Sequence, residues 1–99
     1  MGKGGVIYIL TNKNRTTLYV GLTSDLITRL HDHQTKKYTN SFTARYNLDR
    51  LVYYEIFHSI AEAVAREKQL KAGKRQTKID LIEGFNPEWK DLTEEVLKW

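Results

Sequence analysis

The stretch VIYILTNKNRTTLYVGL, residues 6–22, predicts two adjacent β-strands joined by a polar turn. β-Branched and aromatic residues dominate both ends, and the TNKNRT segment between them is rich in Asn, which tolerates left-handed turn geometry. If the turn is centred on Lys13 and Asn14, Tyr8 lies directly opposite Tyr19 on one face of the hairpin. A change of one residue in the loop would put the rings on opposite faces. The two phenols are therefore either ordinary strand residues or a pair held together for chemistry.

The remaining sequence predicts a third strand and several helices. The strand is RLVYYEIF at 50–57, a loop with a short helix occupies 38–49, and helices are expected at 24–37, 59–75, 75–84 and 86–99. Two adjacent antiparallel strands, then helices, then one more strand indicate an α+β fold with a three-stranded antiparallel sheet flanked by helices. The length of 99 residues, without repeat or linker, predicts a single domain over 1–99.

The helix at 24–37 is expected to begin at Ser24, a suitable N-cap residue, with Asp25 favouring its positive end. Arg29 and His33 are four residues apart, so they share a helix face that borders the buried one. They are either a solvated flank or polar groups that reach over the sheet edge. The expected buried stripe consists of Leu26, Ile27 and Leu30.

The helix at 59–75 carries one acidic residue on its apolar face. Ser59 and Glu62 form a capping box at its start, and Gly73 ends it. Glu67 shares the face of the apolar residues, and a carboxylate on a buried stripe is costly unless it is paired or binds a cation. The alternative is a surface pair between Glu67 and Lys71. The apolar residues of this face are Ile60, Ala63, Val64 and Leu70.

The last predicted helix, 86–99, begins with a strong local signal. Asn86 is the expected N-cap and Pro87 the first helical residue. Its buried side is expected to consist of Trp89, Leu92 and Val96.

Charge is distributed unevenly along the chain. Residues 1–78 carry 14 Lys and Arg against 6 Asp and Glu, whereas residues 79–99 carry 2 against 6, within a net charge of +4. A basic body favours a polyanionic partner, nucleic acid first, although ordinary solubility charge is the alternative. The residues most suited to phosphate contacts form a basic cluster of Lys68, Lys71, Lys74, Arg75 and Lys78.

Several classes of protein are excluded by composition. The sequence has no cysteine, so it forms no disulfide and no thiolate metal site. No apolar run reaches membrane-spanning length and no signal peptide opens the chain, so we expect no membrane association and a cytoplasmic location.

The hairpin motifs resemble the GIY-YIG nuclease family, which is named for two tripeptides on adjacent strands. Here they are Val6-Ile7-Tyr8 and Tyr19-Val20-Gly21. The first tripeptide departs from the family name, because Val6 stands in place of Gly and Gly5 comes just before it. The second keeps its Tyr and its Gly.

Further motifs extend the resemblance over nearly the whole chain. LYVGLTSDLITRLHDH resembles the family's second strand and following helix, with Arg29 at the family arginine and His33 where members carry His or Tyr. EAVAREKQLK resembles the helix with the metal-binding glutamate, which corresponds to Glu67. IDLIEGFNPEWKDL resembles the C-terminal segment of small stand-alone bacterial members, and Asn86 matches an Asn found in part of the family.

The resemblance implies a metal-dependent endonuclease that hydrolyses phosphodiester bonds in DNA. It implies a tyrosine as the base that takes a proton from water, with Tyr8 in that role and Tyr19 orienting water or phosphate. His33 is a rival base, since its reference pKa of about 6.5 needs no tuning. Arg29 would bind phosphate oxygens. Only Glu67 is implicated as a metal ligand, so one Mg²⁺ or Mn²⁺ ion is expected.

Two other functions stay open at this stage. A nucleic-acid-binding module with the nuclease scaffold and little or no catalysis is consistent with the loss of Gly at position 6. A protein-interaction domain would use the acidic C-terminal helix. The sequence does not distinguish DNA from RNA and predicts neither cleavage preference nor oligomeric state.

Overall fold

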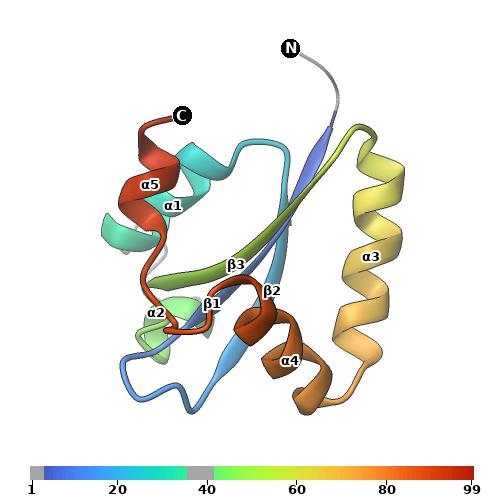
Figure 1. Ribbon diagram of the computed structural model, residues 1–99. Helices are drawn as coiled ribbons and strands as arrows, with labels where there is room; N and C mark the ends of the chain where they lie inside the picture. Colours follow the sequence, from blue (N-terminus) through green and yellow to red (C-terminus); the bar gives the residue numbers. More distant parts are fainter. Residues whose placement is uncertain (1–3, 36–41) are drawn as a thin grey trace.

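The computed structural model describes residues 4–35 and 42–99 and shows an α+β fold with helices on both sides of a small sheet (Figure 1). This architecture confirms the predicted fold class. The elements in chain order are β1 (Gly5–Thr11), β2 (Leu18–Thr23), α1 (Leu26–Thr35), α2 (Phe42–Arg45), β3 (Arg50–Phe57), α3 (Ile60–Ala72), α4 (Arg75–Phe85) and α5 (Thr93–Leu97).

The sheet is antiparallel with the order β2-β1-β3, so β1 is its central strand. In the hairpin, Tyr8 lies opposite Gly21, and Tyr19 lies opposite Leu10. The predicted direct pairing of Tyr8 with Tyr19 is therefore wrong by two residues, although both rings do lie on one face. The turn forms later than expected because the Asn12 side chain accepts hydrogen bonds from the backbone N–H groups of the two threonines at 16 and 17.

Each face of the sheet has its own hydrophobic core. Figure 1 shows α3 and α4 on one side of the sheet and α1 and α5 on the other. The core under α3 and α4 contains Ile7, Ile9, Val20, Val52, Tyr53, Ala63, Leu70, Ile82 and Trp89. The core under α1 and α5 contains Tyr8, Leu10, Leu26, Leu30, Leu48, Leu51, Leu92 and Val96. Tyr8 thus belongs to the second core.

The ends of α1 and α3 follow from local capping. The predicted N-cap of α3 is confirmed, because the Glu62 N–H donates to the Ser59 Oγ atom at 3.0 Å, which is one of the two hydrogen bonds of a capping box. The predicted cap of α1 is wrong by one residue: Asp25, rather than Ser24, accepts the Thr28 N–H at 3.1 Å. An Asp carboxylate is the stronger acceptor, and it also bonds the Thr28 hydroxyl at 2.8 Å.

The apolar stripes of α1 and α3 are narrower than predicted. Leu26 and Leu30 are buried, but Ile27 is 37 % exposed. Likewise, Ala63 and Leu70 are buried, whereas Ile60, at the first turn of α3, is exposed. Both exposed isoleucines lie at the start of their helices.

The predicted helix over 86–99 is wrong in extent, because α5 covers only Thr93–Leu97. Asn86 instead follows the last turn of α4, and its side chain donates to the Val52 carbonyl of β3 at 3.2 Å. The Leu92 N–H donates to the Leu51 carbonyl at 2.7 Å. The chain is therefore tied to β3 before α5 begins. The three residues expected to be buried, Trp89, Leu92 and Val96, are all buried.

Among the residues that the structure describes, no helix is both long enough and apolar enough to cross a membrane.

Candidate active site

Tyr8 on the central strand defines the site, because its ring reaches across the neighbouring strand β2. The side chain is fully buried, and its partner across the hairpin is Gly21. A Cβ atom at Gly21 would collide with the Tyr8 hydroxyl and the adjoining ring carbon. Gly21 therefore makes the room that lets the phenol extend over β2 toward the sheet edge.

Three of the predicted site residues act on the Tyr8 hydroxyl. Its pKa is raised to about 12, chiefly by burial and then by the neighbouring Tyr19 phenol. Arg29 opposes this rise by favouring the phenolate, and the Glu67 carboxylate adds to it. Charged and polar groups from β2, α1 and α3 thus all influence the ionisation of one hydroxyl. No residue in the described part of the chain makes a regular hydrogen bond to that oxygen, although Arg29 lies near enough to influence it.

Tyr19 begins a row of aromatic rings that leads away from Tyr8. Its ring centroid lies 6.4 Å from that of Tyr8 and 6.1 Å from that of Phe42, on which it stacks. Phe42 contacts Tyr46 at 4.7 Å, and the Arg45 guanidinium lies 5.9 Å from the Tyr46 ring centroid. The sequence analysis missed this row, although the four-residue spacing of Phe42 and Tyr46 is a helical signal for it.

Arg29 and His33 both project from α1, as their spacing predicts, but their surroundings differ. Arg29 is exposed, whereas His33 is half-buried with its ring edge toward Tyr8, at 6.2 Å between centroids. The His33 Nδ1 atom lies 3.0 Å from the Thr43 Oγ1 atom. Burial and then Arg29 lower the pKa of His33, and Asp32 opposes them. Because the reference pKa is about 6.5, His33 is mostly neutral at pH 7.

Glu67 lies on α3, on the opposite side of the sheet from the Tyr8 core, and its side chain is 20 % exposed. The predicted pair with Lys71 is present, with 3.1 Å between the Lys71 Nζ atom and the carboxylate. The alternative interpretation of Glu67 as the partner of Lys71 is therefore confirmed, and its role as a metal ligand stays a prediction.

The donor set near Glu67 fits a largely hydrated divalent ion. Within residues 4–35 and 42–99, no group of three or more His, Cys, Asp or Glu side chains is placed to hold a metal. Mg²⁺ is commonly bound through one or two carboxylates while it keeps several waters and substrate phosphate oxygens. The partly exposed Glu67 carboxylate meets that requirement.

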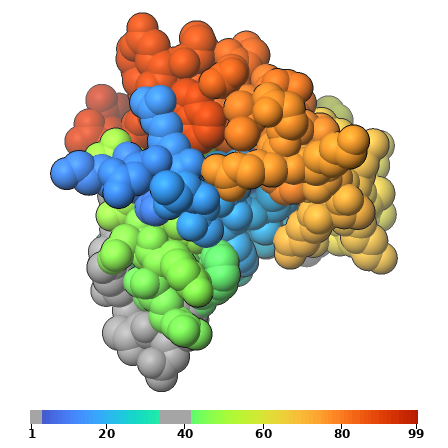
Figure 2. Space-filling view, turned by 90° about the horizontal axis from the view of Figure 1, so that it is seen from below, coloured from blue at the N-terminus to red at the C-terminus, as the bar shows by residue number. Residues whose placement is uncertain are grey.

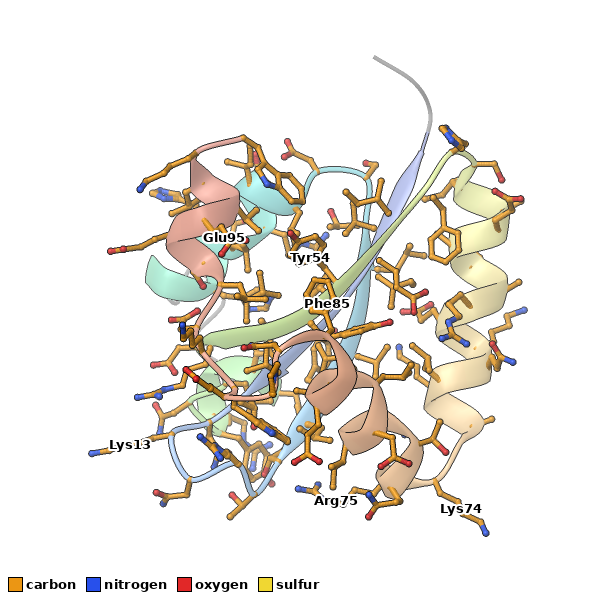
Figure 3. All side chains as sticks on the ribbon, viewed as in Figure 1. Lys13, Tyr54, Lys74, Arg75, Phe85 and Glu95 are labelled. Atoms are coloured by element: carbon orange, nitrogen blue, oxygen red, sulfur yellow. The ribbon has the colours of Figure 1, made fainter. Side chains whose placement is uncertain are left out.

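The predicted basic cluster divides into two groups. Arg75 donates to the Arg15 carbonyl at 3.0 Å and Lys78 to the Gly73 carbonyl at 3.1 Å, so both have structural contacts. Lys68 and Lys74 are exposed. Figure 3 places Lys13 of the β1–β2 loop at the same end of the molecule as Lys74 and Arg75. Figure 2 shows that end, where this loop lies between α2 and α4.

Asn86 is committed to backbone contacts. It is 6 % exposed, its amide nitrogen donates to the Val52 and Lys90 carbonyls, and its amide oxygen accepts the Lys90 N–H at 3.1 Å. These bonds hold the C-terminal segment on β3. They give Asn86 a structural role in the described chain.

A second polar network links β3 to α3. The Arg66 guanidinium binds both oxygens of the Glu55 carboxylate at 3.0 Å, and the Tyr53 hydroxyl donates to the same carboxylate. The sequence analysis missed this network, because residues 11 apart in sequence and on different elements give no local signal.

Comparisons with known proteins show which proteins the chain resembles. Residues 4–80 match the family model described as the GIY-YIG catalytic domain. A UPF0213 protein of Syntrophus aciditrophicus is 35 % identical over 82 residues, which cover 83 % of this chain and 92 % of that protein. One of Staphylococcus haemolyticus is 36 % identical over 81 residues, covering 78 % and 92 %. The solution structure of a UPF0213 protein from Bacillus halodurans matches with a TM-score of 0.58 and 27 % identity, over 92 % of this chain and 95 % of that one.

Proposed function

The chain belongs to the GIY-YIG catalytic domain family, a family of nucleases, and from that premise we propose that it is a metal-dependent endonuclease that hydrolyses phosphodiester bonds in DNA. The observation that carries the proposal is the convergence at the Tyr8 hydroxyl. Tyr19, Arg29 and Glu67 come from three different elements, yet all three influence the pKa of that one group. A buried polar atom surrounded in this way is typical of a functional site.

Arg29 and the two tyrosines would bind the phosphate and the attacking water. Arg29 is exposed, and its planar guanidinium suits two phosphate oxygens at once. The Tyr8 and Tyr19 hydroxyls can each donate one hydrogen bond to a phosphate oxygen or orient the water. This arrangement would place the phosphate at the β2 edge of the sheet.

We favour His33 over Tyr8 as the base that removes the proton from water. A phenol whose pKa is about 12 is ionised in only about one molecule in 100,000 at pH 7. His33 is largely neutral at that pH and can accept a proton without further tuning. Tyr8 then acts as a neutral hydrogen-bond donor.

Glu67 would hold one Mg²⁺ or Mn²⁺ ion. When bound, such an ion supplies positive charge that stabilises the extra negative charge on the phosphate in the transition state. For Glu67 to bind it, the Lys71 ammonium has to give way, and Lys71 is 52 % exposed at its side chain and therefore able to move. In that case Lys71 would be available for a neighbouring phosphate.

The test is Mn²⁺- or Mg²⁺-dependent cleavage by the purified protein, beside Glu67→Gln. The substrates are single-stranded, nicked, branched and duplex DNA, with matching RNA. We expect cleavage by the wild type and its loss in Glu67→Gln, with a far-UV circular dichroism spectrum unchanged. Glu94→Gln, at an exposed glutamate on α5, serves as the matched control and should cleave normally. Equal rates for Glu67→Gln and the wild type would remove Glu67 from the mechanism.

A second candidate function is a nucleic-acid-binding module with little or no catalysis. The full burial of Tyr8 and the Lys71 ammonium on Glu67 favour it, because neither group is then prepared for chemistry. Salt-sensitive binding without cleavage of any substrate, with either metal, would support this function. Sustained turnover would exclude it.

A further inference from the structure

Two buried polar atoms of the candidate site have no hydrogen-bond partner in the described part of the chain. They are the Tyr8 hydroxyl oxygen and the His33 Nε2 atom. Their rings meet edge to face, with 6.2 Å between centroids. Because buried polar atoms are almost always hydrogen-bonded, two such atoms on adjoining rings indicate a small polar site that receives a water molecule or a substrate oxygen.

The other nitrogen of His33 is held by a different element. Its Nδ1 atom lies 3.0 Å from the hydroxyl oxygen of Thr43, a buried residue of α2. A threonine hydroxyl has two acceptor lone pairs besides its one proton, so the Thr43 oxygen is able to accept a hydrogen bond from an Nδ1–H group. In a neutral imidazole, a proton on Nδ1 leaves Nε2 as the acceptor.

We propose that Thr43 is a positioning residue: its hydroxyl accepts the hydrogen bond of Nδ1–H, fixes the tautomer of His33, and keeps Nε2 as the acceptor for a proton of the attacking water. The inference rests on the proposed function. In the step, the water O–H bond breaks and its proton goes to Nε2, while the water oxygen bonds to phosphorus and the bond from phosphorus to the leaving oxygen breaks. The leaving oxygen takes a proton from solvent, and Nε2 returns its own to solvent.

The charges around His33 agree with this role. Arg29 and Asp32 act on the ring from α1 itself, and the neutral Tyr8 phenol packs against it from β1. Arg29 disfavours the imidazolium, so the resting ring keeps a free lone pair. Thr43 is the residue of α2 whose hydroxyl contacts the ring, at the Nδ1 atom.

The first measurement is the tautomer of His33 by long-range ¹H–¹⁵N correlation spectra of the metal-free protein near pH 7. The sequence contains three histidines, so His33→Gln identifies the His33 signals. We expect the wild type to show the proton on Nδ1. Thr43→Val, which replaces the hydroxyl by a methyl group of similar size, should give a mixture of both tautomers. Thr43→Ser should restore the wild-type pattern.

The second measurement is cleavage by the same proteins. We expect Thr43→Val to lower kcat by roughly tenfold to a hundredfold, the range for hydrogen-bond partners that orient metal-bound histidines, with KM little changed. Thr43→Ser should keep most of the wild-type kcat. Backbone ¹H–¹⁵N spectra show whether each variant is folded. If Thr43→Val is unfolded, the tautomer and kcat of Thr43→Ser are compared with those of the wild type instead.

Different outcomes overturn the two proposals. A wild-type His33 with its proton on Nε2, or a Thr43→Val variant with unchanged tautomer and kcat, overturns the role of Thr43 while leaving the nuclease proposal standing. A wild-type protein that cleaves nothing overturns the proposed function, and the catalytic role of Thr43 falls with it even if the tautomer is held as expected.

Discussion

Gly21 shows how one missing side chain shapes the site. The Tyr8 ring occupies the space in which any other residue at position 21 would place its Cβ atom. The second tripeptide of the family motif therefore has a steric reason for its glycine in this chain. The same contact explains why Tyr8 and Tyr19 are diagonal rather than direct neighbours: Gly21, not Tyr19, lies opposite Tyr8.

We expect Gly21→Ala to destabilise the protein by about 1–3 kcal/mol, the usual cost of forcing an extra methyl group into a packed core. Urea unfolding followed by circular dichroism measures it. The matched control is Gly84→Ala in α4, where a Cβ atom meets nothing within 4 Å. That change should be neutral or stabilise by up to about 1 kcal/mol, since Ala favours a helix over Gly. Equal stability of both variants would show that Tyr8 can move aside.

Tyr8 and Tyr53 are two buried tyrosines whose hydroxyls differ in their partners. The Tyr53 hydroxyl donates to Glu55, whereas the Tyr8 hydroxyl has no regular hydrogen-bond partner in the described chain. Burial raises the pKa of each to about 12. Since an unfolded tyrosine titrates near pH 10, the stability that each contributes is fully present below pH 10 and is lost as the pH rises toward 12.

We expect Tyr8→Phe to have unfolding free energy at pH 7 equal to or above that of the wild type, because it removes an unpaired buried hydroxyl. Between pH 10 and 12 it should lose less stability than the wild type, by up to about 2.7 kcal/mol. Tyr53→Phe should instead lose about 1.5–3 kcal/mol at pH 7 through its lost bond to a carboxylate. Denaturant unfolding of the wild type, Tyr8→Phe and Tyr53→Phe from pH 7 to pH 12 provides the measurement. A Tyr8→Phe variant that is less stable than Tyr53→Phe at pH 7 would contradict the prediction.

At the scale of elements, the sequence predicts those helices and strands whose positions are determined by local patterns of residues. The three strands and α3 have their expected positions, because β-branched runs, a capping box and a terminal Gly are local signals. The segment after α4 differs from its prediction. Asn86 and Pro87 give a strong local signal for a helix start, but the Asn86 side chain donates a hydrogen bond to β3 instead. A contact between residues 34 apart in sequence overrides the local preference.

In the candidate site, too, local sequence signals predict some features, and contacts between distant residues determine the rest. Spacing along a helix predicts which face carries Arg29, His33 or Glu67, but the Thr43 contact of His33 comes from another element. The contacts of Thr43 with His33 and of Phe42 with Tyr19 depend on how α2 packs, and no periodicity within one element predicts them.

The contact between Asn86 and β3 gives a prediction at this scale. Asn86→Ala leaves the Val52 carbonyl and both backbone groups of Lys90 without these bonds, so we expect a loss of about 2–3 kcal/mol in unfolding free energy. Asn14→Ala, in the exposed β1–β2 loop, is the control and should change stability by less than about 0.5 kcal/mol. Hydrogen exchange should show faster opening of the Leu92 N–H in Asn86→Ala than in the control. Unchanged exchange at Leu92 would mean that Asp91 and Leu51 hold the segment without Asn86.

The two ends of the molecule carry side chains of opposite charge. Figure 3 shows Glu95 of α5 at the end of the molecule opposite Lys13, Lys74 and Arg75. One end therefore carries these three cations, whereas α5 contributes the carboxylates of Glu94 and Glu95 at the other. Such a molecule has a preferred orientation in the field of a polyanion, with the basic end turned toward the phosphates and α5 away from them.

We therefore expect DNA binding to weaken with salt and to depend on one end of the protein. Each phosphate contact contributes about −0.9 to the slope of log K against log salt concentration on duplex DNA. Lys13→Ala combined with Lys74→Ala should make the slope shallower by about 2, whereas Lys98→Ala, at an exposed lysine that ends α5, should leave it unchanged. Fluorescence anisotropy of a labelled duplex between about 50 and 200 mM salt, with metal omitted to prevent cleavage, measures the slopes. Equal slopes for the double variant and Lys98→Ala would show that the polyanion does not prefer the end of the molecule that carries Lys13 and Lys74.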